Sequence, residues 1–488
     1  MLDPPGVTAL PPGLRIVLDR RARVVDDGAV LFGGAPPRML RLATRARALV
    51  AGGRGFTVAD ATSTKLARTL LDAGIAHPTA APVTAVPSPS DVTVVVPVKD
   101  RVDGLRRLLA ALPGGLGGVV VVDDGSADPA AIAAVAHGAG ARVLCHRTAQ
   151  GPAAARNAGL ATAATPLVAF LDSDVVPEPG WLAPLLTQLA DPAVGLVAPR
   201  IVALAPITGW LGRYEAARSA LDLGADPALV VPMSRVAYVP SAALLVRRAA
   251  VGAGFDERMH VAEDVDLVLR LHAAGWRVRY EPAARVAHDH RTTLATWWLR
   301  KAFYGTGAAP LALRHRGSVP PMVLTPFAAA VGVLALWARP PAAAVGVVVA
   351  AVAVERLARK LPVDRPRRTA ARLIGQGAVG ALNQTADAVT RHYWPVAALA
   401  CLVSARARRR VAVIALAGGV VDWWRDRGRD PRARPGPAGY VLARRLDDLA
   451  YGSGLWWGAL RLRTLEPLRP AGPGSTGSRP PERVSPDG

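Results

Sequence analysis

Leu167-Val168-Ala169-Phe170-Leu171-Asp172-Ser173-Asp174 is the most informative stretch of this chain. Its five apolar residues predict a strand buried on both faces of a sheet, and two carboxylates follow where that strand ends. Two acids one residue apart can face the same point when the backbone turns between them. Their oxygens suit Mg²⁺ or Mn²⁺, which in turn binds a diphosphate. Asp172 and Asp174 are therefore candidate metal ligands, with an ordinary surface turn as the alternative.

Strands and helices alternate on both sides of this stretch, through residues 91–290. The expected strands are 92–96, 118–122, 142–144 and 167–171, and the expected helices are 105–112, 129–137 and 153–163. This order predicts an α/β fold with a mostly parallel sheet flanked by helices. Ligands of such a sheet bind at the carboxyl ends of its strands. We assign this domain to residues 91–310.

The composition excludes several classes of protein. The 488 residues suggest two to four domains, and a hydrophobic content of 51% argues against disorder. Two cysteines cannot make a disulfide scaffold or a four-cysteine zinc site. The net charge of +22 comes almost entirely from dispersed arginines, which become denser around the apolar C-terminal third. We interpret it as compositional bias with membrane-flanking charge, so no nucleic-acid partner is expected.

Four further segments surround the α/β domain. Residues 1–80 form a small module with strands at 14–18 and 29–32 and helices at 38–49 and 65–71, an order that suggests a winged-helix-like fold. Residues 81–90 read as a proline-rich linker, residues 311–470 as an apolar helical region and residues 471–488 as a disordered tail. The first residues lack the features of a signal peptide, so the N-terminus is expected in the cytosol.

The helical region contains two long apolar runs, Met322–Ala338 and Pro341–Val354. The first just reaches the lower limit of about 17 residues for a membrane-spanning helix, and the second falls short. Basic residues flank the pair on both sides, which predicts a hairpin at the cytoplasmic membrane with the catalytic domain facing the cytosol. The alternative is a pair of buried helices in a soluble domain. The runs Val396–Val403 and Val411–Val421 are too short to span and are expected to be interfacial or packed.

Acidic residues also end the neighbouring predicted strand. Asp123 and Asp124 follow Val119–Val122, where a carboxylate can accept hydrogen bonds from a uracil N–H or a ribose hydroxyl. The competing explanation is a helix cap before Pro129, but Ser126 or Asp128 can supply that cap. Both explanations can therefore hold together.

Other polar residues complete the candidate site. Pro97, Asp100 and Arg101 leave the strand 92–96, where they can meet a base, and Arg156 can pair with phosphate or lie on the surface. Glu263 and Asp264 open a helix, where acids are stabilised by the helix dipole, and they are candidates for a general base acting on an acceptor hydroxyl. His288 and His290 end the α/β region, and either can complete a metal site, contact phosphate or serve the structure alone.

Taken together, these motifs resemble the inverting family 2 glycosyltransferases of GT-A fold. The matching stretches occur in the family order: 95–98, 122–126, 155–159, 170–174, 254–257 and 263–267. The resemblance implies that Asp124, with Asp123, contacts the nucleoside and that Asp172 and Asp174 hold Mg²⁺ or Mn²⁺ on a sugar-nucleotide diphosphate. It also implies that Asp264, beside Glu263, is the base. The Gln-x-x-Arg-Trp motif of processive members is absent, which argues against cellulose-synthase-like secretion.

The layout of the whole chain resembles the mycofactocin-system glycosyltransferases of actinobacteria. The N-terminal module resembles peptide-recognition elements of ribosomal-peptide maturation, and the stretches 288–293 and 297–307 follow the catalytic domain. This resemblance implies transfer of glucose from UDP-glucose to a peptide-derived redox cofactor precursor, building a β-1,4-glucan-like chain. The alternative is a membrane glycosyltransferase acting on a polyprenyl phosphate or a cell-envelope glycan. A non-catalytic binding protein is disfavoured because the four central aspartates are present.

Overall fold

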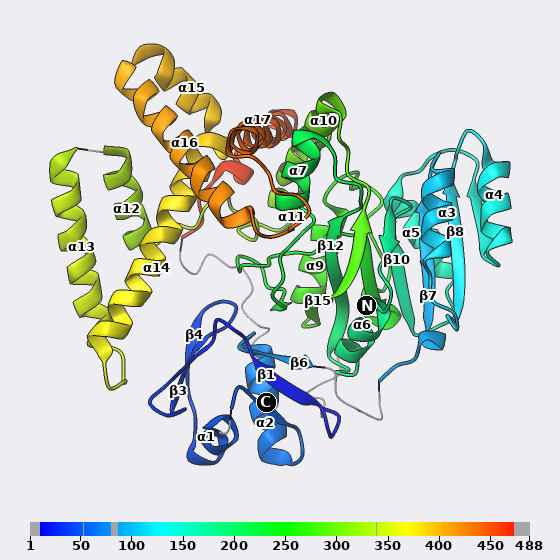
Figure 1. The fold of residues 1–488 in the computed structure, drawn as a ribbon, viewed down its shortest axis with the longest axis horizontal. Helices are drawn as coiled ribbons and strands as arrows, with labels where there is room; N and C mark the ends of the chain where they lie inside the picture. Colours follow the sequence, from blue (N-terminus) through cyan, green and yellow to red (C-terminus); the bar gives the residue numbers. More distant parts are fainter. Residues whose placement is uncertain (1–9, 52, 80–85, 338, 473–488) are drawn as a thin grey trace, which may run out of the picture. The chain divides into compact units, whose positions relative to one another are not determined.

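The computed structural model describes residues 10–51, 53–79, 86–337 and 339–472 (Figure 1). The chain divides into two compact units. One holds the residues up to Ile207 together with Arg218–Arg291, and the other holds Thr208–Ala217 and the residues from Thr292 onward. The sequence predicts this boundary after residue 310. Residues 81–85 of the predicted linker and nearly all of the predicted tail lie outside the described residues.

The N-terminal module contains two small antiparallel sheets. The first has the order β5-β1-β6, with β1 at Arg15–Leu18, β5 at Gly55–Thr57 and β6 at Ala76–Thr79. The second has the order β2-β3-β4, with β2 at Arg23–Val25, β3 at Val30–Gly33 and β4 at Arg38–Arg41. Helices α1 (Thr44–Ala51) and α2 (Ala61–Asp72) complete the module.

One element of this module differs from the prediction. The sequence spacing predicted a single helix over residues 38–49, but residues 38–41 form β4 and the helix begins at Thr44. Leu40 pairs with Leu31 and Met39 with Phe32, so β3 gains a hydrogen-bonded neighbour. The spacing of the apolar residues fits two arrangements equally: one continuous helix, or a strand followed by a helix. The pairing with β3 selects the second arrangement.

Three ion pairs join the N-terminal module to the α/β domain within the same unit: one between Arg21 and Asp226, and two that involve α2. Arg68 of α2 donates two hydrogen bonds to Asp191, at 2.8 and 3.0 Å. Arg277 donates two hydrogen bonds to Asp72, at the end of α2, at 2.5 and 2.7 Å. Paired guanidinium–carboxylate contacts fix orientation as well as distance. The module is therefore held against the sheet by α2.

The α/β domain is built on one large sheet of order β11-β15-β12-β14-β10-β7-β8-β9, with β13 paired to β15. Its strands are β7 (Val92–Val98), β8 (Gly118–Asp124), β9 (Arg142–His146), β10 (Leu167–Leu171), β11 (Val175–Pro177), β12 (Val194–Ala203), β13 (Ala228–Leu229), β14 (Ala243–Arg247) and β15 (Arg277–His288). The half made of β10, β7, β8 and β9 is parallel, as predicted. The other half is mixed, because β14 runs antiparallel to both β10 and β12.

Helices cover both faces of this sheet. The helices are α3 (Val102–Ala110), α4 (Pro129–Gly138), α5 (Pro152–Thr162), α6 (Leu182–Leu189), α8 (Arg248–Val251) and α9 (Glu263–Ala273). Residues of α3, α4 and α6 join Val94 and Val96 in one buried cluster. Residues of α5, α8 and α9 join Val95 in the cluster on the other face. Successive residues of a strand point to opposite faces, so the continuous valine run fits a sheet covered on both sides.

The second unit is helical. It contains α7 (Gly209–Arg218), α10 (Leu294–Thr306), α11 (Ala308–Arg314), α12 (Pro326–Trp337), α13 (Pro340–Ala358), α14 (Pro366–Asp387), a π turn (Ala388–His392), α15 (Trp394–Val403), α16 (Ala405–Asp426) and α17 (Pro437–Arg461). A buried polar cluster joins α7, α10 and α17: Lys301 pairs with Glu215 at 2.9 Å and Asp447 at 3.4 Å, and Trp297 donates to Glu215. Each buried charge thus has a partner.

The two apolar runs form helices of unexpected lengths. Of the described residues, only α13 is long and apolar enough to cross a membrane, judged by length and composition. By length in the sequence, Met322–Ala338 is the better candidate for a spanning helix, but α12 begins only at Pro326 and has 12 residues. Residues 322–324 instead bond to Ala471 through the backbone. The second run lies in α13. This helix continues past Glu355 and Arg356, the two charged residues that end the apolar stretch in the sequence.

Candidate active site

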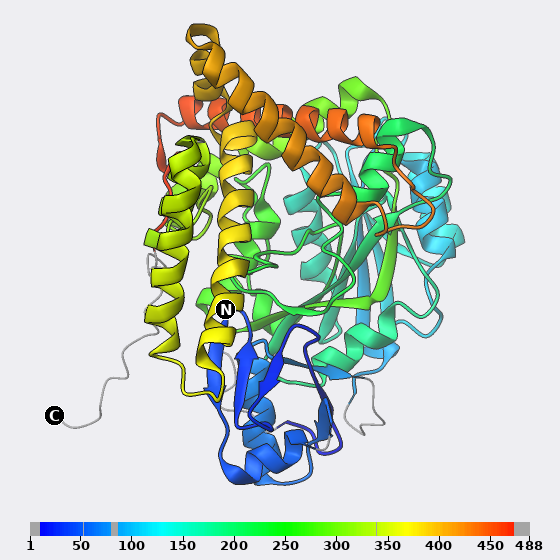
Figure 2. The same cartoon turned by 60° about the vertical axis from the view of Figure 1, so that its left-hand side comes forward.

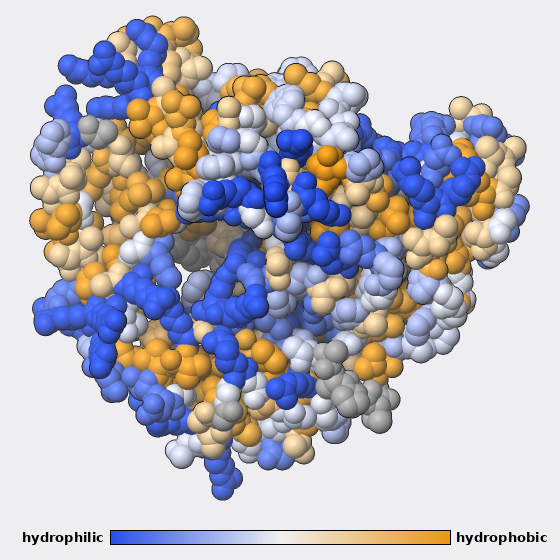
Figure 3. Space-filling view, in the orientation of Figure 1, coloured by the Kyte–Doolittle hydropathy of each residue, from blue (hydrophilic) through white to orange (hydrophobic). Residues whose placement is uncertain are grey.

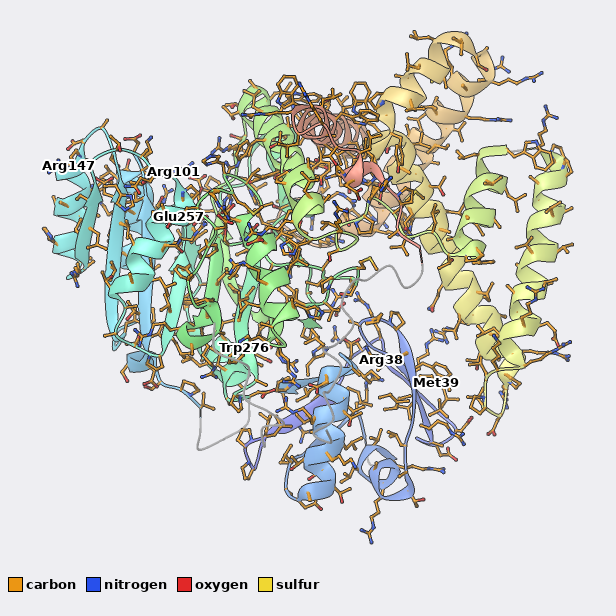
Figure 4. All side chains as sticks on the ribbon, turned by 180° about the vertical axis from the view of Figure 1, so that it is seen from behind. Arg38, Met39, Arg101, Arg147, Glu257 and Trp276 are labelled. Carbon is orange, nitrogen blue, oxygen red and sulfur yellow. The ribbon has the colours of Figure 1, made fainter. Side chains whose placement is uncertain are left out.

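Three parallel strands, β7, β8 and β10, end at the same edge of the catalytic sheet, which we call the carboxyl edge. Figure 4 shows Arg101 and Glu257 at this end of the sheet and Trp276 at the opposite end. The predicted residues that follow the three strands are, in strand order, Asp100 and Arg101, Asp123 and Asp124, and Asp172 and Asp174. The fold therefore brings together residues that the sequence spreads over some 75 positions, from 100 to 174.

Asp100 links the loops that follow β7 and β8. Its Oδ1 accepts a hydrogen bond from the backbone N–H of Ala127 at 2.7 Å, and its own N–H donates to Oγ of Ser126 at 2.9 Å. Its φ of +56° is in the left-handed region. Pro97 is buried within β7, opposite Val122. The contacts of Asp100 hold the rim of the site in place. The side chain of Arg101, in the same loop, faces Asp174 of the Asp172-Ser173-Asp174 stretch, which we call the DxD motif.

The two acids that end β8 have different environments. Asp124 accepts hydrogen bonds from the backbone N–H groups of Gln150 and Gly151 and pairs with His146, each at 2.8 Å. Burial opposes its charge, but these three hydrogen bonds prevail and lower its pKa. Asp123 is 1% exposed, and within the described chain its Oδ2 atom has no hydrogen-bond partner. Asp124 thus anchors the loop before α5, and Asp123 retains an acceptor for a ligand.

Arg156 of α5 connects the DxD motif to the candidate base. Its side chain is 2% exposed, with Nη2 at 2.6 Å from Asp172 Oδ1 and Nη1 at 3.0 Å from Glu263 Oε1. The guanidinium also lies over the ring of Phe255. Burial disfavours its charge, but the carboxylates of Asp172 and Glu263 outweigh burial and raise its pKa. The sequence offered phosphate pairing or a surface position for Arg156; the structure places it inside, bonded to two carboxylates.

Asp172 and Asp174 are partly exposed at the carboxyl edge, at 29% and 23% of their side-chain surface. Asp174 Oδ2 lies 3.8 Å from Nη1 of Arg101, and its Oδ1 lies 3.6 Å from Nε2 of His288. His288 ends β15 and so reaches the same edge. The site therefore joins carboxylate oxygens, which suit Mg²⁺ or Mn²⁺, and an imidazole nitrogen, which suits transition-metal ions better than Mg²⁺.

The two histidines have separate positions in this cluster. His290 lies beside His288, with 3.2 Å between their Nδ1 atoms, while His288 presents Nε2 to Asp174. Across the described ranges, no group of three or more histidine, cysteine or acidic side chains is arranged to hold a metal ion by itself. A cation here would take several ligands from substrate phosphate and water, as Mg²⁺ commonly does.

Asp264 has the properties of a general base. Its carboxylate accepts hydrogen bonds from the backbone N–H groups of Ser241 at 3.0 Å and Val265 at 2.8 Å. Burial and the neighbouring Glu263 raise its pKa to about 6, although these hydrogen bonds and the charge of Arg156 act in the opposite direction. A carboxylate with a raised pKa is a stronger base, so the environment of Asp264 suits proton abstraction near neutral pH.

This raised pKa predicts the pH dependence of any reaction in which Asp264 is the general base. A protonated carboxyl cannot accept a proton, so kcat/KM should fall in acid and rise as Asp264 loses its proton, with a midpoint near pH 6. The measurement is a kcat/KM profile from pH 4.5 to 8 at constant ionic strength. A profile without an ascending limb between pH 5 and 7 would argue against Asp264 as the base.

Asn157 lies within the matching stretch 155–159 beside Arg156, and the sequence pattern assigns it no role. Its Oδ1 accepts from the backbone N–H of Phe255 at 2.9 Å, and its Nδ2 donates to the carbonyl of Phe255 at 2.9 Å and to Glu257 at 2.8 Å. Arg156 and Asn157 thus point to different neighbours, one toward the acids and one toward the loop before α9. In the sequence, the glycine turn at Gly151 shortly before these two residues was the signal that could have marked Asn157 as part of the site.

The loop that Asn157 holds has little room for change at Gly254. This residue has a φ of +81°, and an added Cβ would lie 2.2 Å from Oδ1 of Asn157. We expect Gly254→Ala to destabilise the protein by about 1–3 kcal/mol, because backbone strain and a broken hydrogen bond act together. Thermal unfolding of this variant beside Gly252→Ala, which also has a positive φ, separates the steric contact from the strain. Equal losses would show that the contact with Asn157 contributes nothing.

Comparison with known proteins identifies this arrangement. Residues 93–249 match the family described as Glycosyl transferase family 2. The pre-mycofactocin glycosyltransferase of Mycobacterium tuberculosis (strain CDC 1551 / Oshkosh) is 48% identical over 469 residues, which cover 95% of this chain and 98% of that relative. The chain belongs to glycosyl transferase family 2. It is thus a glycosyltransferase, and both its predicted resemblance to the mycofactocin-system enzymes and its α/β fold of GT-A type are confirmed.

More distant relatives match less of the chain. The succinoglycan biosynthesis protein ExoU of Rhizobium meliloti is 30% identical over 210 residues, covering 39% of this chain and 60% of that protein. Among solved structures, the mannosyltransferase PcManGT from Pyrobaculum calidifontis, in complex with GDP-Man and Mn²⁺, is 20% identical. The matched region covers 70% of this chain and 90% of the mannosyltransferase, with a TM-score of 0.37.

Proposed function

We propose that this glycosyltransferase transfers a hexose, glucose from UDP-glucose, to pre-mycofactocin. The observation that carries the acceptor is the 48% identity to the pre-mycofactocin glycosyltransferase, which extends over 95% of the chain and therefore beyond the catalytic domain. The choice of UDP-glucose and the building of a β-1,4-glucan-like chain rest on the family resemblance. The N-terminal module, held by α2 against the catalytic sheet, supports an acceptor of peptide origin.

The carboxyl edge supports an inverting displacement. Asp264 takes the proton of the acceptor hydroxyl. The oxygen of that hydroxyl attacks the anomeric carbon, on the face opposite the departing nucleoside diphosphate. Asp123 offers its Oδ2 to the nucleoside, and Arg156 holds Asp172 and Glu263 at fixed positions. Because these groups are fixed before substrate binds, little reorganisation is needed at the moment of reaction.

The residues at this edge fit a divalent cation, Mg²⁺ or Mn²⁺. Asp172 and Asp174 supply carboxylate oxygens, and His288 supplies a nitrogen close to Asp174. When bound, such a cation stabilises the negative charge of the leaving diphosphate. Arg101 adds positive charge to the same position through its contact with Asp174.

Membrane association is part of the proposal. Large apolar side chains of the helical unit are exposed, among them Val347 at 70%, Leu402 at 78% and Val403 at 87%. Figure 3 shows apolar surface over α12 and α13. Contiguous exposed apolar surface of this kind favours contact with a membrane. We place the protein at the cytoplasmic membrane, with the catalytic domain on the cytosolic side.

The same apolar surface favours a second candidate function, transfer to a polyprenyl phosphate or a cell-envelope glycan. That acceptor would use every residue of the proposed mechanism. The N-terminal module is the feature that separates the two functions, because a lipid-linked acceptor gives it no role.

The test is a donor and acceptor screen by mass spectrometry. The full chain in mild detergent, with Mg²⁺ or Mn²⁺, is incubated with a panel of nucleotide sugars and either pre-mycofactocin or polyprenyl phosphate. Stepwise addition of hexose to pre-mycofactocin from UDP-glucose supports the proposal. Sugar found only in the lipid fraction would overturn it in favour of the second function.

A further inference from the structure

Helices α12, α13 and α14 enclose an apolar groove within the helical unit. The three helices contact one another in every pair and lie side by side (Figures 1 and 2). The groove has a volume of about 380 Å³. Its walls are Phe327, Val331, Leu334 and Ala335 of α12, Ala342, Ala343, Gly346 and Ala350 of α13, and Ala378 and Leu382 of α14. None of these side chains offers a hydrogen bond, so the groove suits a hydrocarbon.

The groove is surrounded by exposed apolar surface. Val345, Val347 and Val348 on α13 are 44%, 70% and 61% exposed, and Val333 on α12 is 65% exposed. A groove that opens onto such a surface is reached from an apolar medium more readily than from water. Its occupant is therefore expected to come from a bilayer rather than from the cytosol.

One charged residue completes the lining. Arg339 lies between α12 and α13 and is the only charged side chain on the groove wall. Within the described part of the chain, the structure records no hydrogen bond or ion pair for its guanidinium. Arg410 of α16 donates to the carbonyl of Trp337 at 2.6 Å, which brings a second guanidinium to the same end of α12. This end of the groove complements a negatively charged group.

We propose that the groove holds one acyl chain of an anionic phospholipid, with the phosphate of its headgroup at Arg339. The small side chains of α13 leave the space for the chain, and the larger ones of α12 and α14 line it. The proposal rests on the membrane association proposed above, and it gives that association a defined lipid site. It is independent of which sugar or acceptor the catalytic domain uses.

Gly346 and its neighbour provide a matched pair of variants. A Cβ built on Gly346 lies 3.9 Å from the side chain of Leu334 and is otherwise open, so the Gly346→Leu side chain starts in free space and extends from the groove wall. Leucine also favours a helix more than glycine does, so this variant should fold. Val347→Leu adds bulk one residue along the same helix, on the exposed face. Arg339→Gln removes the charge alone.

The experiment is native mass spectrometry of the full chain in detergent with dioleoyl phosphatidylglycerol or dioleoyl phosphatidylcholine. We expect wild type and Val347→Leu to retain one phosphatidylglycerol and to prefer it at least tenfold over phosphatidylcholine. Gly346→Leu should lose at least tenfold in retention, and Arg339→Gln should retain both lipids equally. Equal retention of both lipids by wild type, full retention by Gly346→Leu, or displacement of phosphatidylglycerol by equimolar polyprenyl phosphate would each overturn the proposal.

Glycosyl transfer to a soluble acceptor, measured on the same samples, separates this test from that of the proposed function. Full transfer activity in Gly346→Leu with lost lipid retention supports the groove as a lipid site distinct from catalysis. Retained lipid in a preparation that transfers no sugar would count against the proposed function and leave the groove proposal standing.

Discussion

Asp264→Asn is expected to lower kcat for glycosyl transfer by about 10²–10⁴-fold, the usual contribution of a general base. Asparagine has nearly the shape of aspartate, and its oxygen can keep one of the backbone hydrogen bonds that position the side chain. It cannot accept the proton of the acceptor hydroxyl. The loss should therefore appear in kcat, measured by product formation at saturating donor and acceptor, with little change in donor affinity.

The control for this variant is Asp103→Asn, which removes an exposed carboxylate on α3 that pairs with Arg106. It should leave the rate unchanged, since exposed pairs of this kind contribute little. The ascending limb of the pH profile near 6 should also disappear in the residual activity of Asp264→Asn. A variant that retains more than a tenth of the wild-type kcat would show that another group takes the proton.

Arg156→Lys is expected to lower kcat/KM by about 10²-fold. Lysine keeps the positive charge, but its single ammonium cannot bridge Asp172 and Glu263 with the two separate nitrogens that arginine provides. Asp172 then loses its fixed position at the carboxyl edge, and a displacement of about 1 Å at a reacting centre can cost this factor. Separate determination of kcat and KM for the donor tests the claim, because Asp172 is proposed to act on the donor and Glu263 adjoins Asp264, the proposed base.

Arg156→Ala adds a measurement of stability. It leaves a buried glutamate without its partner, so we expect the free energy of unfolding to fall by about 3–5 kcal/mol. Arg106→Ala, which removes an arginine from an exposed ion pair, is the control and should change stability by less than about 1 kcal/mol. If Arg156→Lys were fully active and Arg156→Ala as stable as wild type, the bridge between the two acids would have no role.

Neither Arg156 variant bears on the choice of acceptor. Both act through the geometry of groups that every candidate reaction shares, so they test the mechanism alone. The donor and acceptor screen remains the test of the substrate, and the lipid measurement remains the test of the groove.

The residues of the carboxyl edge could be selected from the sequence because local patterns mark them. Runs of β-branched residues predict buried strands. A polar residue directly after such a run lies at the end of a strand, whatever position that strand takes in the sheet. Asp123, Asp172 and Asp174 were found in this way. The opening acids of α9 were found because charges before an apolar helical repeat mark its beginning.

The sequence by itself therefore determined the α/β class, the order of strands and helices, and the set of acids at one edge. Tertiary structure alone decided which contacts each of these residues makes. Asp124 bonds to a loop 26 residues away, and Asp123 keeps an acceptor atom. Arg156 is buried between two carboxylates. It also decided that residues 38–41 pair with β3 and that α13, rather than α12, is the long apolar helix. The reason is physical: periodicity and turn chemistry act between near neighbours, whereas burial and pairing depend on residues that only the fold brings together.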